Sequence, residues 1–210
     1  MMLRNLLVTF GDSLYYWLLS RELSGMKSVL DVGCGARSPL AKVPKTFRSV
    51  GVDIFEESIQ KSKRAHIHDE YVRSDVAQIG EKFRSKSFDA VVALDLIEHL
   101  TKDEGEKLIL SMERVARKKV IIMTPNGFYM QEPYEANPYQ VHKSGWETDD
   151  FTKRGFKVWG IRGLKVLRGE YATIRWKPWI IWGTISALSQ YPLLWFPRLS
   201  HQLFAVKHVQ

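Results

Sequence analysis

Residues 29–35, with the sequence VLDVGCG, join an apolar run to two closely spaced glycines. The run predicts a buried strand, and Gly33 and Gly35 would let the backbone of the following turn approach a ligand without a Cβ in the way. A dinucleotide-binding turn of the G-x-G-x-x-G type needs a third glycine at position 38, where this chain has Ser38. Asp31 would also place a carboxylate beside two phosphate charges, so the turn suits a ligand that carries an ammonium group instead.

Two further polar positions follow expected strand ends. Asp53 closes the next apolar run, about 20 residues after Asp31, where a carboxylate can hold both hydroxyls of a ribose. Asp75 and Val76 follow the third run, and a short polar side chain next to an apolar one can bind an adenine amino group and cover its ring. An aspartate after a strand is also common as a turn or cap residue, so each position alone discriminates little.

In this order, the motifs resemble those of class I S-adenosylmethionine-dependent methyltransferases. The resemblance covers roughly residues 28–156, with LDVGCG at 30–35, GVD at 51–53, SDV at 74–76, FDAVVALDLIEH at 88–99 and VIIMTPN at 120–126. The fourth motif ends in Glu98 and His99. In this feature the chain is similar to the subgroup that includes methyltransferases of ubiquinone and menaquinone biosynthesis. Arg37 departs from the pattern, since many members carry a third glycine there.

The resemblance implies that the cofactor is S-adenosylmethionine and assigns a part of it to each matching residue. The residues implied to contact it are Asp31, Gly33 and Gly35 at the methionyl part, Asp53 at the ribose, Asp75 and Val76 at the adenine, and Leu94 and Asp95 on the remaining side, and Ile54 is a further cofactor-binding residue. A sulfonium cofactor that carries an ammonium group and no phosphate is compatible with carboxylates around the glycine turn.

Two histidines are candidates for acid–base catalysis. His99 follows Asp95 by four positions, so in a helix the two side chains would share a face that begins where the ligand should lie. An unperturbed histidine pKa of about 6.5 suits removal of a proton from a phenol or enol near neutrality. His142, in the aromatic segment before Trp146, is the second candidate. The alternatives are that His99 supports the local helix and that His142 is a surface-loop residue.

The 210-residue chain carries 31 Lys and Arg against 23 Asp and Glu, a formal net charge of +8. This excess of positive charge favours an anionic partner such as nucleic acid, a membrane surface or an acidic substrate. The single cysteine, Cys34, excludes an internal disulfide and a zinc knuckle, and we expect it to be a small buried residue rather than a nucleophile. No bound metal is expected, and the N-terminus has no signal-peptide cleavage pattern, so we expect a cytoplasmic location.

Apolar runs at 28–32, 49–54, 71–74, 88–94 and 119–123 predict strands, and 56–64 and 103–117 predict helices, the second capped by Asp103. A short helix at 148–154 and strands at 156–166 and 201–209 follow. The expected fold is α/β: a Rossmann-like, doubly wound, mostly parallel seven-stranded sheet with an antiparallel last strand, in one domain over residues 1–210. An N-terminal helix and an aromatic helical insert before the last strand complete it.

Three segments extend the expected domain. Residues 1–25 form an N-terminal helical extension, whose apolar residues at helical spacing predict one face buried on the domain: Leu3, Leu6, Leu7, Phe10, Leu14, Trp17 and Leu18. Its alternatives are a membrane-surface or dimer helix. Residues 124–146 contain three tyrosines, a tryptophan and several prolines, which predicts a lid loop that selects an acceptor with an apolar or ring-like surface.

Residues 171–200 form the third segment, the aromatic insert. It contains no carboxylate, and Pro192 together with several Ser and Thr side chains argues against a membrane span. One interpretation is a helix that covers the substrate pocket or a homodimer interface. The other is an interfacial helix that seats tryptophans at lipid headgroups beside basic residues, namely Trp176, Trp179, Trp182 and Trp195 with Arg175, Lys177 and Arg198.

The sequence therefore predicts an S-adenosylmethionine-dependent methyltransferase that acts at oxygen or carbon of a small-molecule or lipid-linked acceptor, in the cytoplasm or peripherally at the inner membrane surface. A non-catalytic module that binds an S-adenosyl ligand, a membrane or a partner is one alternative, for which Arg37 is the argument. A nucleic-acid methyltransferase is less favoured, because Lys and Arg are dispersed and the loop after residues 119–123 reads TPNG rather than NPPY.

Overall fold

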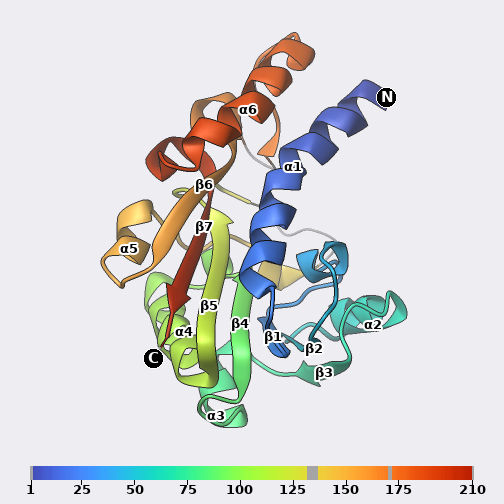
Figure 1. The fold of residues 1–210 in the computed structure, drawn as a ribbon, viewed down its shortest axis with the longest axis vertical. Helices are drawn as coiled ribbons and strands as arrows, with labels where there is room; N and C mark the ends of the chain where they lie inside the picture. The colour runs from blue at the N-terminus through green and yellow to red at the C-terminus, as the bar shows by residue number, and fades with distance from the viewer. Residues whose placement is uncertain (1, 132–136, 170–171, 210) are drawn as a thin grey trace.

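The computed structural model describes residues 2–131, 137–169 and 172–209, with only the backbone for residues 2–12. The strands are β1 (Ser28–Val32), β2 (Arg48–Asp53), β3 (Glu70–Arg73), β4 (Phe88–Leu94), β5 (Ala116–Pro125), β6 (Lys157–Leu164) and β7 (Ser200–His208). The helices are α1 (Met2–Leu23), α2 (Glu56–Arg64), α3 (Ile79–Lys82), α4 (Lys102–Val115), α5 (Thr148–Thr152) and α6 (Trp179–Leu193). The strands form one sheet in the order β3-β2-β1-β4-β5-β7-β6 (Figure 1).

The predicted fold class is confirmed. Strands β1 to β5 pair in parallel, and β7 runs antiparallel to both β5 and β6. The chain leaves β1 toward β2 on one side and later returns to β4 on the other, so the order of the strands reverses beside β1. In open sheets of this kind, a ligand binds in the crevice at the carboxyl ends of the strands on either side of that reversal.

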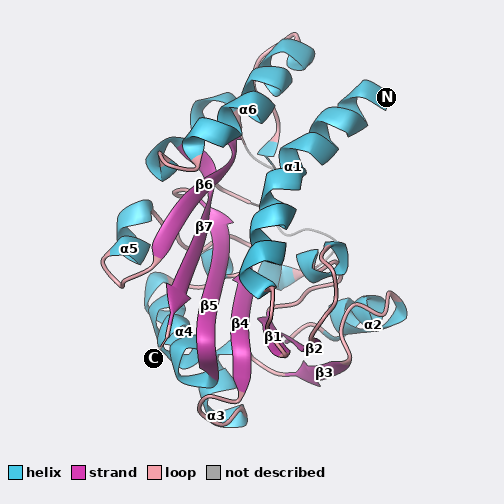
Figure 2. Ribbon diagram, viewed as in Figure 1, coloured by secondary structure: helices cyan, strands magenta, loops and turns pink. Residues whose placement is uncertain are grey.

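Helices lie on both faces of the sheet (Figure 2). The side chains of the central strands alternate between two cores, one on each face. Val92 and Ile121 pack with α1, whereas Val91 and Val120 pack with α4 on the opposite face. Because both faces are covered, the central strands carry continuous rather than alternating apolar runs, which is the pattern that identified them in the sequence.

Helix α1 packs on the sheet, but through a face shifted from the predicted one. Leu14 and Leu18 are buried as expected, together with Tyr15 and Leu19, whereas Trp17 is 53% exposed. At 3.6 residues per turn, the face that contains Leu14 and Leu18 passes through Tyr15, so Trp17 points to the other side. The predicted apolar positions at 3, 6, 7 and 10 lie outside the residues whose side chains are described.

The N-terminal half of α1 and helix α6 project together beyond one end of the sheet (Figure 1), and the two helices contact each other. Helix α6 lies in the predicted aromatic insert before β7, so this prediction is also confirmed. Among the described residues, no helix combines the length and the apolarity needed to span a bilayer.

Two details of helix α4 differ from the prediction. Thr101, not Asp103, caps the helix: its side chain accepts a hydrogen bond from the Glu104 backbone N–H, and the Glu104 carboxylate accepts one from the Thr101 backbone N–H. This reciprocal pair satisfies two backbone donors at once, which a lone aspartate at 103 would not do. The helix ends at Val115, because the following residues pair with β4 as the start of β5.

Candidate functional site

The turn after β1 requires its glycines. Gly33 and Gly35 have φ values of 69° and 57°, in the left-handed region that side chains with a Cβ rarely adopt. A Cβ on Gly33 would lie 2.5 Å from a methyl of Leu96. The backbone N–H groups of Gly33 and Cys34 both donate to the carbonyl oxygen of Val52, at 2.8 and 2.9 Å, which ties the turn to β2.

Asp53, at the end of β2, is held by the same turn. Its carboxylate accepts hydrogen bonds from the backbone N–H groups of Gly35 and Phe55, each at 2.8 Å. Burial raises the pKa of the Asp53 carboxyl above its usual value, while these backbone donors oppose that shift. The side chain is thus fixed between the glycine turn and the start of α2, where a ribose hydroxyl pair could be bound.

These residues border a cavity of about 190 Å³ at the carboxyl ends of the strands, which we call the first cavity. Most of the residues predicted to bind the cofactor line it: Gly33, Gly35, Asp53, Ile54, Asp75, Val76 and Asp95. Asp75 has a second role, since its carboxylate accepts a hydrogen bond from the Ala77 backbone N–H and caps the turn that follows. Sequence position therefore located the first cavity well.

Asp31 and Leu94 lie outside this lining. Asp31 is buried, its Oδ2 accepts a hydrogen bond from the Ser38 hydroxyl at 2.5 Å, and Nε2 of His68 lies 3.2 Å from the same oxygen. Leu94 packs in the core beneath α1. The contact of Asp31 with an ammonium group stays a prediction, and Ser38 and His68 are neighbours that the sequence motifs did not identify.

Two residues of the glycine turn that carried alternative interpretations lie away from the first cavity. Arg37 is exposed and is not among the residues that line it. Cys34 is buried, and burial together with the charges of Asp31 and Asp53 raises the pKa of its thiol far above the usual range. A thiol in this environment is a packed side chain, as predicted, rather than a nucleophile.

After β4, the chain turns sharply instead of starting a helix. Asp95 has a φ of 54°, and Ile97–His99 form one short 3-10 turn. Asp95 and His99 therefore do not share a helical face, and that prediction is wrong. The φ of Asp95 lies outside the right-handed helical region, and its backbone N–H donates to the carbonyl oxygen of Met123 at 2.9 Å, which ties this residue to the end of β5.

The segment that carries His142 is hydrogen-bonded to this turn. The backbone N–H groups of Lys143 and Ser144 donate to the Glu98 carbonyl oxygen at 2.8 and 3.1 Å, and the indole N–H of Trp146 donates to the Ile97 carbonyl oxygen at 3.3 Å. Trp146 is fully buried, so it anchors the predicted lid rather than facing an acceptor. Of the three tyrosines in that lid, Tyr134 lies outside the described residues.

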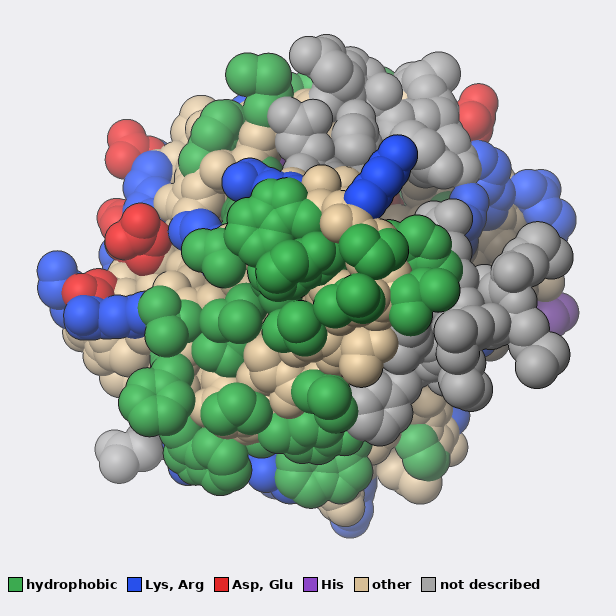
Figure 3. Space-filling view, turned by 90° about the horizontal axis from the view of Figure 1, so that it is seen from above, with side chains coloured by type: hydrophobic (Ala, Val, Ile, Leu, Met, Phe, Trp, Pro, Cys, Tyr) green, Lys and Arg blue, Asp and Glu red, His purple; other side chains and the backbone are tan. Residues whose placement is uncertain are grey.

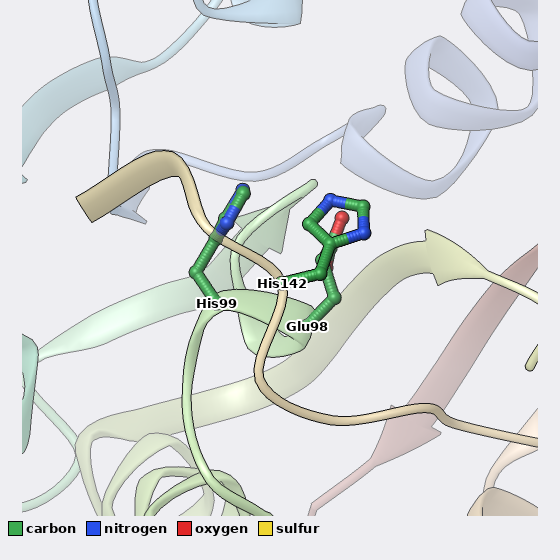
Figure 4. Close-up of side chains that lie close together, drawn as sticks. All are labelled: Glu98, His99 and His142. Atoms are coloured by element: carbon green, nitrogen blue, oxygen red, sulfur yellow. The ribbon is translucent and has the colours of Figure 1, made fainter. Parts of the chain in front are cut away.

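This anchoring brings His99 and His142 together, with ring centroids 4.9 Å apart, beside Glu98 (Figure 4). The Nδ1 of His99 donates to the Val141 carbonyl oxygen at 3.3 Å, and the Nδ1 of His142 donates to that of Tyr129 at 2.7 Å. Burial lowers the pKa of His99 to about 4 and also lowers the pKa of His142. Both rings are neutral near pH 7, and His99 is a weaker base than an unperturbed histidine.

Glu98 is nearly completely buried between the turn and β5. Its carboxylate accepts a hydrogen bond from the Thr124 hydroxyl at 2.9 Å. Burial, and next the charge of Asp95, raise the pKa of the Glu98 carboxyl well above its usual value. The carboxyl group therefore lacks a cation among the residues that the structure places against it, which is uncommon for a buried acid.

A second cavity, of about 250 Å³, lies on the other side of His99. Its lining comes from the turn after β4, the predicted lid, β6, the segment between β6 and α6, and β7: Asp95, Glu98, His99, Pro125, Tyr129, Met130, Gln131, Gln140, His142, Arg162, Gly169, Ala172, His201 and Gln202. Asp95, His99 and Gln140 line both cavities. The two spaces are therefore neighbours that share one wall.

Sequence motifs did not identify the contribution of β6, β7 and α1 to this region. Gln202 donates through its side-chain amide to Asp95 at 2.9 Å, and burial with nearby arginines lowers the pKa of His201 to about 3. Tyr15 of α1 is fully buried, and its hydroxyl has no hydrogen-bond partner among the described residues. No local signal marks these residues, because they meet Asp95 only through the fold.

Comparison with known proteins gives the fold a class. Residues 30–124 match the model of a family described as a methyltransferase domain. The fold resembles a SAM-dependent methyltransferase from Archaeoglobus fulgidus, with 18% sequence identity and a TM-score of 0.59 over 96% of this chain and 98% of that chain. It also resembles magnesium protoporphyrin IX methyltransferase from Synechocystis PCC 6803 with bound SAM, with 19% identity and a TM-score of 0.53 over 96% of this chain and 79% of that chain.

A third structure, YcgJ protein from Bacillus subtilis, shares the fold at 12% identity and a TM-score of 0.60, over 94% of this chain and 98% of that chain. None of the curated proteins matches the chain in sequence. Residues 30–124, which include the strands that line the first cavity, match a methyltransferase domain, and the chain has the fold of class I S-adenosylmethionine-dependent methyltransferases. Its cofactor is S-adenosylmethionine.

Proposed function

We propose that this methyltransferase transfers the methyl group to an oxygen or a carbon of a small or lipid-linked acceptor. The observation that carries the proposal is the pair of neighbouring cavities. The first is bordered by the residues that the family resemblance assigns to the cofactor, and the second opens on the other side of Asp95, His99 and Gln140. An acceptor in the second cavity would meet a cofactor in the first across this shared wall.

The reaction itself needs mainly alignment. A sulfonium methyl group is already activated, so holding the acceptor in line with it and excluding water can supply on the order of 7 to 11 kcal/mol. The predicted lid contributes Tyr129 and Met130 to the second cavity and Tyr139 to the first. We assign to this segment the selection of an acceptor with an apolar or ring-like surface, with His99 and His142 as the groups nearest to its reacting atom.

Binding of S-adenosylmethionine or S-adenosylhomocysteine should raise the melting temperature. At about 100 times the dissociation constant, a ligand adds roughly 2.7 kcal/mol to the free energy of unfolding, which corresponds to about 5 to 10 °C for a chain of this size. Differential scanning fluorimetry measures the shift, and NADH is the control ligand. A shift with NADH alone, or with none of the three, would contradict the assignment of the first cavity.

Helix α6 supports the proposal of a lipid-linked acceptor, because its buried face contains polar side chains and its exposed face is apolar. The face that packs on β6 includes the fully buried polar side chains Ser186 and Gln190. The opposite face exposes the large apolar side chains of Ile180, Ile181, Ile185 and Leu188, and Trp195 and Phe196 just after the helix are exposed as well. A helix on the surface of a protein in water normally shows the reverse pattern. None of these exposed residues lines the second cavity, so the helix does not cover it.

The exposed residues form a broad apolar surface at the end of the molecule, with Lys and Arg side chains at its edge (Figure 3). Arg175 and Lys177, just before α6, are exposed, and residues 172–209 contain no carboxylate. Apolar and aromatic side chains next to cations are complementary to an anionic bilayer surface. We therefore assign this surface to a lipid interface, where a lipid-linked acceptor would be available.

Co-sedimentation with vesicles tests this assignment. Wild-type protein should bind phosphatidylglycerol-containing vesicles, and the double change Ile181→Asp and Ile185→Asp should lower the partition coefficient at least about tenfold, because it places two charges in the apolar face. Leu110→Asp, at an equally exposed leucine on α4, is the matched control and should bind like the wild type. A different result would assign the surface to a second copy of the chain instead. In that case the wild type would not bind the vesicles and would be a dimer in solution, and the double variant would be a monomer.

A further inference from the structure

Glu98, His99 and His142 form a compact group of possible metal ligands. Their side chains lie close together (Figure 4). One ligand atom from each side chain lies within 4.8 Å of the others, and all three line the second cavity. Two of them come from the 3-10 turn after β4 and the third from the segment that Lys143 and Ser144 bind to this turn. The group is therefore assembled by main-chain hydrogen bonds rather than by flexible surface side chains.

Each side chain is also oriented in the way that metal ligands are. A carbonyl oxygen can only accept, so the bonds from His99 to Val141 and from His142 to Tyr129 place the ring proton on Nδ1. The Nε2 lone pair of each neutral ring is then available to an ion. The Glu98 carboxylate is held in turn by the Thr124 hydroxyl. Such outer hydrogen bonds to imidazole and carboxylate ligands are typical of built metal sites.

We propose that Glu98, His99 and His142 bind one divalent transition-metal ion. Two imidazoles and one carboxylate suit ions such as Mn²⁺, Fe²⁺ or Zn²⁺ better than Mg²⁺, which prefers oxygen ligands. Three protein ligands also leave coordination positions open, as in catalytic rather than structural sites. The second cavity adjoins all three side chains, so an acceptor oxygen there can occupy an open position.

The role of the ion rests on the proposed function and refines it. A bound cation lowers the pKa of a hydroxyl that it coordinates, so the hydroxyl proton passes to water and the acceptor is held as an oxyanion. The oxygen–methyl bond then forms as the sulfonium–methyl bond breaks, and S-adenosylhomocysteine leaves with the electron pair of the broken bond. The acceptor atom is therefore oxygen, and the two imidazoles act as ligands rather than as bases.

Direct metal binding tests the site without any assay of methyl transfer. Isothermal titration of tag-free, EDTA-stripped protein with Mn²⁺ and with Zn²⁺ should show one ion per chain, and Mg²⁺ should bind much more weakly. Glu98→Gln, His99→Ala and His142→Ala should each weaken binding about 100-fold or more, since loss of an outer partner alone costs about 10- to 100-fold. His208→Ala, at an exposed histidine on the far end of β7, is the matched control and should bind like the wild type.

Two outcomes would overturn the metal site: no binding of Mn²⁺ or Zn²⁺ by the wild type, or equal affinity in the wild type and the three variants. His142 lines only the second cavity, so His142→Ala should keep the thermal shift with S-adenosylhomocysteine, which shows that the variant is folded. If an alanine variant fails to fold, the metal affinity of the near-isosteric variant Glu98→Gln decides whether the site binds the ion. If S-adenosylhomocysteine caused no thermal shift in the wild type, this result would contradict the proposed function and would leave the metal site unaffected.

Discussion

Replacement of Asp53 by Ala should weaken the binding of S-adenosylmethionine and S-adenosylhomocysteine about 100-fold or more. If the carboxylate holds both ribose hydroxyls, two charge-assisted hydrogen bonds are lost, each worth about 1.5 to 3 kcal/mol. The same change also frees the backbone N–H groups of Gly35 and Phe55, which the carboxylate now holds. The glycine turn then loses its connection to the end of β2, and both effects lower the affinity.

Isothermal titration with S-adenosylhomocysteine measures this loss, and Asp103→Ala is the matched control. Asp103 is an exposed carboxylate in the first turn of α4 and is not among the residues that line either cavity. The control should bind within about twofold of the wild type. Asp53→Asn separates the two causes, because an amide oxygen can still accept one backbone hydrogen bond while the charge is absent. An Asp53→Ala variant with wild-type affinity would show that the ribose is held elsewhere.

Replacement of Trp146 by Ala should lower the free energy of unfolding by about 3 to 5 kcal/mol. The indole is fully buried, its ring centroid lies 5.5 Å from that of Phe151, and Lys102 lies over it at 3.8 Å. Its N–H also donates to Ser144 and to the Ile97 carbonyl oxygen. Removal therefore creates a large cavity and releases the segment that holds His142 against the turn after β4.

Urea denaturation measures the loss, with Trp195→Ala as the matched control. Trp195 is 73% exposed, so its replacement should change the free energy of unfolding by no more than about 0.5 kcal/mol. Trp146→Phe keeps most of the packing and removes only the N–H, so its cost should be smaller than that of Trp146→Ala. Equal stability of the Trp146→Ala variant and the wild type would mean that the segment is anchored by its backbone alone.

The residues that border the first cavity could be predicted from the sequence because their signals are local. Strands of a parallel sheet that is covered on both faces carry continuous apolar runs, and glycines or polar residues follow these runs where the chain faces the ligand. Gly33, Asp53 and Asp75 stand at such ends, and all three line the first cavity. The same reasoning places Asp31 beside the ligand, which stays a prediction, and the structure adds that the buried carboxylate is held by Ser38 and lies next to His68. A strand pattern does not show which way a buried polar side chain points.

The arrangement around the second cavity was decided by tertiary structure. A positive φ at Asp95 and the pairing of its backbone with β5 replaced the expected helix by a tight turn, and backbone hydrogen bonds to Glu98 then brought His142 next to His99. Helix α6 likewise has a composition that predicts an aromatic insert, but only its packing on β6 shows that the polar side is buried and the apolar side exposed. Local composition determines which elements form and where a strand ends. Contacts between distant residues depend on how those elements pack, and this packing places the histidines, Glu98 and the apolar face of α6.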